Sequence, residues 1–192
     1  MKRTYKVQFR RKRKGETNYR KRLKLLLSNK LRLVVRRSLN NMQAQIIEYN
    51  ADGDKVILTA HSRELEKFNW KINKGNIPAA YLVGLLIAKK ANKKGINGLI
   101  LDLGLNKSVK GSRIYALLKG VVDGGIKISH SESILPSKER LAGEHIVKYA
   151  SLLKKDEKEY ERRFSRYIKN KIEPVGINKY FEEVKKKIMG AS

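Results

Sequence analysis

The alternation of apolar and polar residues in the first third of the chain predicts three β-strands. Segments 31–37, 42–49 and 55–62 have the period of two that is typical of a half-buried strand. Short connections join them, and Asp52-Gly53 between the last two is a strong hairpin signal. We therefore expect a three-stranded antiparallel meander.

A period near 3.6 residues follows the meander. It predicts a helix over 77–94, with Pro78 in its first turn and Gly95 just past its end. The apolar run 98–103 then predicts a buried strand, which a crossover returns to the same sheet. Two more helices are expected, one from near Ser112 and one from near Ser137 through the 140s. The expected fold class is α/β, with a mixed sheet and flanking helices.

Residues 151–192 contain two further amphipathic stripes. The first consists of Tyr160, Phe164, Tyr167 and Ile168, and the second of Ile177, Tyr180, Phe181, Val184 and Ile188. Pro174 and Gly176 lie between the stripes and separate two helices. Each stripe needs an apolar partner, which the domain, the other helix or a neighbour can supply. We expect a helical C-terminal extension after an α/β domain at 17–150.

Residues 1–16 lack hydrophobic periodicity, so no apolar burial offsets the entropy of ordering them. We expect an extended basic arm that is mobile until it binds. A short helix should follow, capped by Thr17 or Asn18, with one face docked on the core. That face comprises Tyr19, Leu23, Leu26 and Leu27, and the opposite face comprises Arg20, Lys21 and Lys24.

The chain has 192 residues, of which 45 are basic and 18 acidic, giving a formal net charge of +27. Residues 1–37 carry 16 basic groups and 1 acidic group, so more than half of the excess lies there. The corresponding numbers are 9 and 5 for 38–95, 7 and 5 for 96–146, and 13 and 7 for 147–192. Charge of this size opposes folding unless a polyanion neutralises it. Nucleic acid is therefore the expected partner.

The amino-acid composition and the apolar runs exclude several kinds of site and several classes of protein. A hydrophobic content of 41% is sufficient for a core, and the absence of cysteine excludes disulfides and thiolate metal sites. The longest apolar run, 77–88, is shorter than the roughly 20 residues that span a bilayer. The N-terminus lacks the apolar segment of a signal peptide. We expect a soluble cytoplasmic protein without a membrane partner.

Candidate catalytic groups are few. The histidines are His61, His130 and His145, and Glu144-His145 lacks the second histidine of a metal or acid–base motif, which favours a structural role. Asp102 ends a buried strand, where α/β enzymes place catalytic groups, but capping or loop ordering is favoured. No nucleophile elbow is present. We expect no enzyme activity, catalytic residue, metal, cofactor or small-molecule substrate.

The loop 104–112 contains Gly104 and Gly111 before a predicted helix. Its spacing does not fit G-x-x-x-x-G-K-[ST], so nucleotide hydrolysis is not expected. The N–H groups at a helix start can still hold a phosphate, and a solvated loop is the equal alternative. The residues that would assist are Lys107, Lys110, Ser112 and Arg113.

The run from Arg10 to Lys14 is the best-defined candidate site. Each phosphate contact that it makes adds roughly 0.7 to 0.9 to the salt dependence of log affinity. Tyr5, Phe9 and Tyr19 are interleaved with these cations and could stack on unpaired bases, although Tyr19 could equally pack in the core. Arginine-rich arms that fold on contact suit structured RNA, while charge alone does not exclude DNA.

The first predicted strand also carries arginines. Arg32 and Arg36 share the face opposite Leu33 and Val35. These two arginines could simply be solvated on the outer face of the sheet, or they could contact RNA. Because the basic arm lies next to them in the sequence, we favour RNA contact.

Four blocks carry a family resemblance: RRKRKGETNYRKRLKLLLSNKLRLVVRRS, GNIPAAYLVGLLIAKKA, LDLGLNKSVKGSRIYALLKGVVDGG and GEHIVKYA. In this order they resemble the archaeal form of the universal large-subunit ribosomal protein family numbered eighteen. The resemblance covers about residues 5–150, and 151–192 resemble more loosely the C-terminal extension of archaeal and eukaryotic members. Asn29-Lys30-Leu31 stands where members commonly have Gly-Lys-Pro, which leaves the turn geometry there open.

The resemblance implies a structural protein that binds 5S rRNA and attaches it to large-subunit rRNA in the central protuberance, beside neighbouring ribosomal proteins. Two alternatives stay open: a basic DNA-packaging protein, and an RNA-processing enzyme with acids or histidines beside the basic face. The expected RNA-binding residues are Lys6, Arg10, Arg11, Lys12, Arg13, Lys14, Thr17, Tyr19, Arg20, Arg22, Arg32, Arg36, Arg37, Lys107, Lys110, Ser112 and Arg113.

Overall fold

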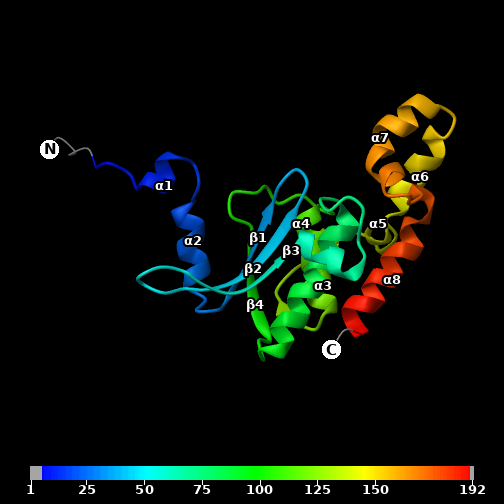
Figure 1. Cartoon of the computed structure of the whole chain (residues 1–192). Helices are drawn as coiled ribbons and strands as arrows, with labels where there is room; N and C mark the ends of the chain where they lie inside the picture. Colours follow the sequence, from blue (N-terminus) through cyan, green and yellow to red (C-terminus); the bar gives the residue numbers. More distant parts are fainter. Residues whose placement is uncertain (1–5, 191–192) are drawn as a thin grey trace.

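A five-stranded mixed sheet forms the centre of the computed structural model, which describes residues 6–190 (Figure 1). Across the sheet the strands are β3 (Lys55–His61), β2 (Met42–Glu48), β1 (Arg32–Arg37), β4 (Gly98–Asp102) and β5 (Lys127–Ile128). β1, β2 and β3 pair antiparallel, and β4 lies parallel to β1 on its other side. The predicted meander and the return to a further strand are confirmed. β5 was not predicted, because two residues show no alternation.

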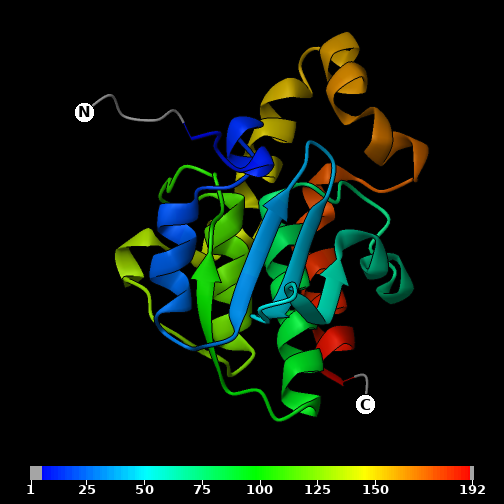
Figure 2. The same cartoon turned by 90° about the vertical axis from the view of Figure 1, so that its left-hand side faces the viewer.

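Two helices cover one face of the sheet: α3 (Ile77–Lys93) and α4 (Arg113–Asp123), behind the strands in Figure 2. α3 is buried along most of its length because the sheet, α4 and the C-terminal helix surround it. Leu33, Val35 and Ala44 of the sheet are fully or almost fully buried in the same core. Within residues 6–190, no helix combines the length and apolarity needed to cross a bilayer.

α3 and α4 cross at two glycines. A Cβ on Gly84 would overlap the carbonyl oxygen of Leu117, and one on Gly120 would overlap that of Tyr81. Only glycine at both positions allows the two backbones to approach this closely. The Tyr81 hydroxyl adds a second link by donating to Asp123 Oδ2 at 2.9 Å, and its burial raises the pKa of this phenol.

The last helix, α8 (Ile177–Gly190), packs against α3. Tyr180 stacks on Trp70 with ring centroids 5.5 Å apart, and its hydroxyl accepts a hydrogen bond from the backbone N–H of Lys71 at 3.0 Å. The predicted stripe is confirmed, because the partner surface is the domain itself. Its fully buried members are Ile177, Phe181, Val184 and Ile188.

The segment between α4 and α8 contains three more helices: α5 (Lys138–Ala142), α6 (Glu144–Leu153) and α7 (Glu157–Lys169). Ser137 caps α5, but the single helix expected there is two, because Gly143 has φ +95° and separates α5 from α6. Phe164 and Tyr167 of α7 are buried as predicted, whereas Ile168 is 45% exposed. Short 3₁₀ helices lie at Ser62–Phe68, Glu132–Ile134 and Pro174–Gly176.

The opposite face of the sheet is covered in part by α1 (Arg10–Arg13) and α2 (Tyr19–Leu26), in front of the strands in Figure 2. Asn18 caps α2 through its side-chain oxygen, which confirms one of the two expected caps. The expected docking is wrong for Leu23 and Leu27, which are 61% and 74% exposed. The apolar face of α2 has the period of a helix, but the described chain covers only part of that face.

The N-terminal arm was expected to be extended, but part of it is helical. Residues 1–5, including the candidate stacking residue Tyr5, lie outside the described part, but Arg10–Arg13 form a helical turn. Phe9 packs on Tyr19 with ring centroids 5.2 Å apart and gives this turn apolar support. Before β1, Asn29 adopts φ +50°, a region that glycine favours and asparagine tolerates.

The glycine crossing gives a test of the packing. By helix propensity alone, Gly84→Ala would stabilise α3 by roughly 0.5–1 kcal/mol. Because the added methyl meets the α4 backbone, we expect the free energy of unfolding to fall by about 2 kcal/mol or more instead. Urea denaturation measures the change. Gly176→Ala, where a Cβ meets open space, is the control; equal effects of the two substitutions would contradict the close crossing.

Candidate nucleic-acid interface

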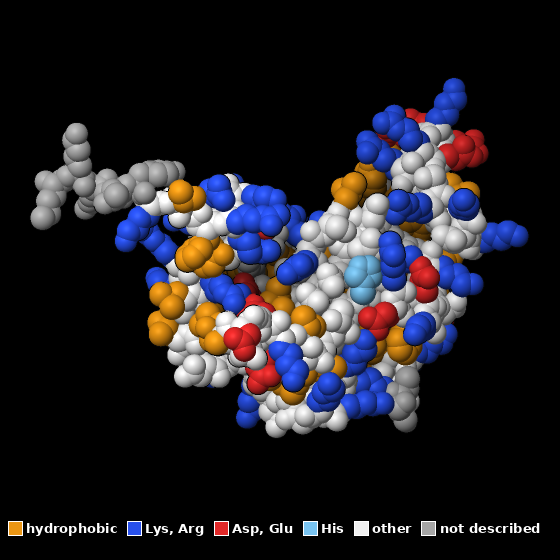
Figure 3. Space-filling view, turned by 60° about the vertical axis from the view of Figure 1, so that its left-hand side comes forward, with side chains coloured by type: hydrophobic (Ala, Val, Ile, Leu, Met, Phe, Trp, Pro, Cys, Tyr) orange, Lys and Arg blue, Asp and Glu red, His pale blue; other side chains and the backbone are white. Residues whose placement is uncertain are grey.

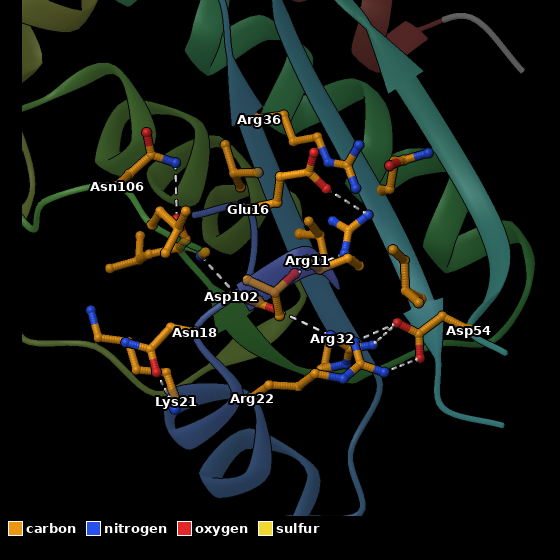
Figure 4. A pocket seen from close by; sticks show the side chains of 18 of the residues that line it. Arg11, Glu16, Asn18, Lys21, Arg22, Arg32, Arg36, Asp54, Asp102 and Asn106 are labelled. Atoms are coloured by element: carbon orange, nitrogen blue, oxygen red, sulfur yellow. Dashed lines mark hydrogen bonds and ion pairs between the residues drawn. The ribbon is translucent and has the colours of Figure 1, made fainter. Parts of the chain in front are cut away.

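Arg32 lies on the open face of the sheet, but its side chain is buried. The residue is 2% exposed, and its guanidinium donates to Asp54 Oδ2 at 2.7 Å and to Asp102 Oδ2 at 3.0 Å (Figure 4). Arg32 was expected to present a cation to RNA, but in this structure its charge is paired within the chain. A guanidinium held between two carboxylates has a structural role, since leaving it unpaired in the interior would be costly.

Arg22 extends this network to α2. Its guanidinium makes two hydrogen bonds to the Asp54 carboxylate, at 2.7 and 2.8 Å. The hydrogen bond from Arg22 is the main cause that lowers the pKa of Asp54, and the same bond raises the pKa of Arg22. The network thus joins α2, β1, the end of β4 and the turn before β3. Expected to contact RNA, Arg22 in this structure fastens α2 over the sheet.

Part of the N-terminal candidate set is engaged within the arm itself. Arg11 donates from Nε to the Thr17 hydroxyl at 2.8 Å and pairs with Glu16 at 3.3 Å. Tyr19 is half-buried against Phe9. These contacts fold the segment after α1 back against α2 and fix the direction in which α1 points.

The other cations of the segment are exposed and uncompensated. Among the described residues, none of them has a carboxylate within 4.0 Å, so their charge is available to a polyanion. Figure 3 shows Lys and Arg side chains gathered over the N-terminal helices, with hydrophobic side chains between them. The set is Lys6, Arg10, Lys12, Arg13, Lys14 and Arg20.

A groove of about 890 Å³ lies between this segment and the sheet (Figure 4). Val34 and Val56 of the sheet contribute apolar surface, and Arg36 of β1 and Lys21 of α2 line it. Within the described chain, neither cation has a carboxylate partner. Arg36 was expected in the site; Lys21 was missed, although its position on the polar face of α2 was visible in the sequence.

The glycine loop lies at the end of β4. The Asp102 carboxylate accepts a hydrogen bond from Gly104 N at 2.9 Å, which confirms the loop-ordering interpretation of this acid. Arg37 donates to Asn106 Oδ1 at 2.9 Å and joins the loop to β1. Lys107 and Lys110 are exposed, as a phosphate contact requires.

The start of α4 differs from the expected phosphate site. Ser112 is the N-cap residue, but its hydroxyl is buried and makes no capping hydrogen bond. Arg113 donates to the carbonyl oxygens of Gly75 at 2.6 Å and Ser38 at 3.2 Å, and burial lowers the pKa of its guanidinium. Arg113 therefore braces two loops in this structure, and the exposed cations of the loop are the two lysines.

The groups considered for catalysis are separated. Asp102 lines the groove, whereas His145 lines another cavity of about 340 Å³ beside α6 and α7. Glu144 makes a distant pair with Lys148 at 3.9 Å. Within residues 6–190, no three His, Asp or Glu side chains gather as metal ligands. The convergence that an RNA-processing enzyme would require is absent from the described part of the chain.

The fold and this surface define a basic α/β protein with a cation-rich face for a polyanion. The chain belongs to the family described as ribosomal large subunit proteins 60S L5, and 50S L18, whose model matches residues 3–99 and 92–131, more than half of the sequence. It is therefore a structural protein of the large ribosomal subunit, associated with ribosomal RNA and other large-subunit proteins. The expected cytoplasmic, ribosomal location follows from the family.

The carboxylate network predicts a pH dependence of stability. Since folding lowers the pKa of Asp54, its contribution is fully present above its usual pKa of about 4 and is lost as the pH falls below it. We expect Asp54→Asn to reduce the free energy of unfolding at pH 7 by about 2–3 kcal/mol. The difference from the unmodified chain should shrink toward pH 3 in urea titrations. Asp52→Asn, in the same turn, is the control; if it costs as much at pH 7, the network is not the cause.

Proposed function

We propose that this chain binds 5S rRNA and attaches it to large-subunit rRNA in the central protuberance, as an archaeal-type member of its family. The observation that carries the proposal is the helical turn at Arg10–Arg13 followed by Lys14: an exposed cation cluster with only Arg11 paired to an acid in the described chain. Neighbouring proteins of the protuberance are the further partners of this proposal. We assign the arm to 1–16, the α/β domain to 17–150 and the helical extension to 151–192.

The mechanism is neutralisation of phosphates by a positioned arm. Each neutralised phosphate releases counterions, so affinity depends steeply on salt. α1 does not have to find its direction on binding, because the contacts of Arg11 with Thr17 and of Phe9 with Tyr19 already set it. The Arg22–Asp54 pair then relates the arm to the sheet and to the lysines of the glycine loop. The result is a set of cations with a fixed mutual arrangement.

RNA rather than DNA is favoured by two features. The family associates with ribosomal RNA. In addition, Phe9 is 71% exposed next to the cations, where it can stack on an unpaired base, which folded RNA offers and a regular duplex does not.

The arm can be tested with matched charge changes. We expect Arg10→Ala/Lys12→Ala/Arg13→Ala to weaken binding to 5S rRNA about 100-fold and to reduce the salt slope of log affinity by about 2, since three phosphate contacts are lost. The melting temperature should change little, because these side chains are exposed. Fluorescence anisotropy across a salt series measures both quantities.

The control removes the same charge elsewhere, with Lys93→Ala/Lys127→Ala/Lys186→Ala, all exposed residues far from the arm in the sequence. Equal losses in the two triple variants would show that net charge, rather than the arm, determines binding. Equal affinity of the unmodified chain for duplex DNA at the same salt would instead favour a packaging protein.

A further inference from the structure

α7 carries its charges in two groups. Glu157, Glu159 and Glu161 lie near its start with one cation, Lys158, and all charged residues from Arg162 onward, called here its second half, are cations: Arg162, Arg163, Arg166 and Lys169. The helix dipole favours acids near the start and cations in the last turn. Phe164 has non-helical backbone angles and kinks the helix, so Arg162 and Arg163 end its first part, while Arg166 and Lys169 lie near the end of its second part. The dipole is compatible with all four cations, and their contacts decide whether they are available to a ligand.

These cations are exposed and almost free of acids. Arg163 has a single acidic partner, Glu159, at the limiting distance of 4.0 Å. Arg162, Arg166 and Lys169 have no carboxylate within 4.0 Å among residues 6–190. The second half of α7 therefore has the property of the N-terminal arm: charge that the described chain does not neutralise.

The turn between β1 and β2 lies beside α7 and presents an apolar side chain. Arg166 reaches Asn40 Oδ1 at 3.5 Å, and Arg113 holds the carbonyl of Ser38. Hydrogen bonds between Ser38 and Asn41 close the turn. At its tip Leu39 is 88% exposed, so an ordered turn holds a leucine in water between cationic neighbours.

This turn lies between α1 and α7 in both cartoon views (Figures 1 and 2). Figure 3 shows the surface hollowed between the N-terminal helices and the α6–α7 region. The recess has the arm as one wall, α7 as the other and the β1–β2 turn between them. Arg166 of α7 contacts the turn, so α7 and the described part of the arm border one recess although more than 140 positions separate them in the sequence.

We propose that the second half of α7 and the β1–β2 turn form a second RNA contact, so that a ribosomal RNA segment in the recess is held from two sides. This inference rests on the proposed function and adds a surface to it. Leu39 packs on a ribose or an exposed base, while the α7 cations contact phosphates. An acidic protein is a poorer fit, because the core of a protein interface is depleted of charged residues, and here Leu39 lies beside the exposed cations of α7.

Charge reversal tests the α7 wall. We expect Arg162→Glu/Arg166→Glu to weaken RNA binding by about tenfold or more and to lower the salt slope by about 1.5, as the loss of two phosphate contacts requires. Binding is measured with the full chain against 5S rRNA and, separately, against the large-subunit rRNA that adjoins it. The RNA whose binding is lost is the occupant of the recess.

The matched control is Lys186→Glu/Lys187→Glu on α8, which changes the net charge equally at exposed positions. Equal losses in both double variants, or no loss in the α7 variant with either RNA, would overturn the inference. If that happens while the Arg10/Lys12/Arg13 variant still loses affinity, the proposed function stands and only the α7 contact fails. If the unmodified chain binds neither RNA, both are overturned.

The absence of cysteine allows a direct measurement of position. Single variants Leu39→Cys, Lys169→Cys and Met189→Cys can each carry a tethered iron chelator that cleaves nearby RNA through hydroxyl radicals. We expect strand cleavage from positions 39 and 169, at neighbouring nucleotides, and none from position 189 at the exposed end of α8. Cleavage from position 189 alone, or from none of the three in an RNA-bound complex, would contradict the recess as the RNA site.

Discussion

The pairing of Arg32 with Asp54 and Asp102 determines how the functional surface is held together. A guanidinium taken out of water needs charged partners, and these come from positions 22 and 70 residues away in the chain. Asp54 also binds Arg22, and Asp102 also orders Gly104. Through these carboxylates, helix α2 and the loop after β4 are therefore both linked to the buried guanidinium of Arg32. Arg32 lines the groove, yet its role is to hold these elements together, because its charge is already paired.

The chain separates two kinds of positive charge. Arg22, Arg32 and Arg113 are used inside the protein, where carboxylates or backbone carbonyls receive them. The remaining cations of the candidate surface are exposed, so water and salt screen their mutual repulsion. This separation explains how a chain with a net charge of +27 can have an ordinary apolar core. The sequence composition cannot distinguish the two kinds, because both are arginines next to strands and turns.

Much of the fold could be predicted from the period of its apolar residues, and the site only in part. The longer strands, α3 and the apolar stripe of α8 follow the spacing of apolar residues that are close in the sequence, and the structure has these elements where that spacing predicts them. Arg32 could not be placed correctly, because alternation identifies a face of a strand but not the acids that tertiary contacts bring to it. The arm was expected to be extended, since the Phe9–Tyr19 contact that supports its turn is not a periodic signal. Gly143 can take a positive φ because it is a glycine, but a glycine within a helical pattern does not by itself show that the helix ends there.

The exposed leucines of α2 have a consequence for the order of assembly. Leu23 and Leu27 form an apolar ridge in water, next to cations that repel any second copy of the chain. Repulsion keeps unassembled molecules apart as long as their positive side chains have no counterion. Once phosphates neutralise those side chains, the ridge becomes free to associate. The positive charge that attracts a polyanion thus also opposes association between the apolar surfaces of two molecules until the polyanion is bound.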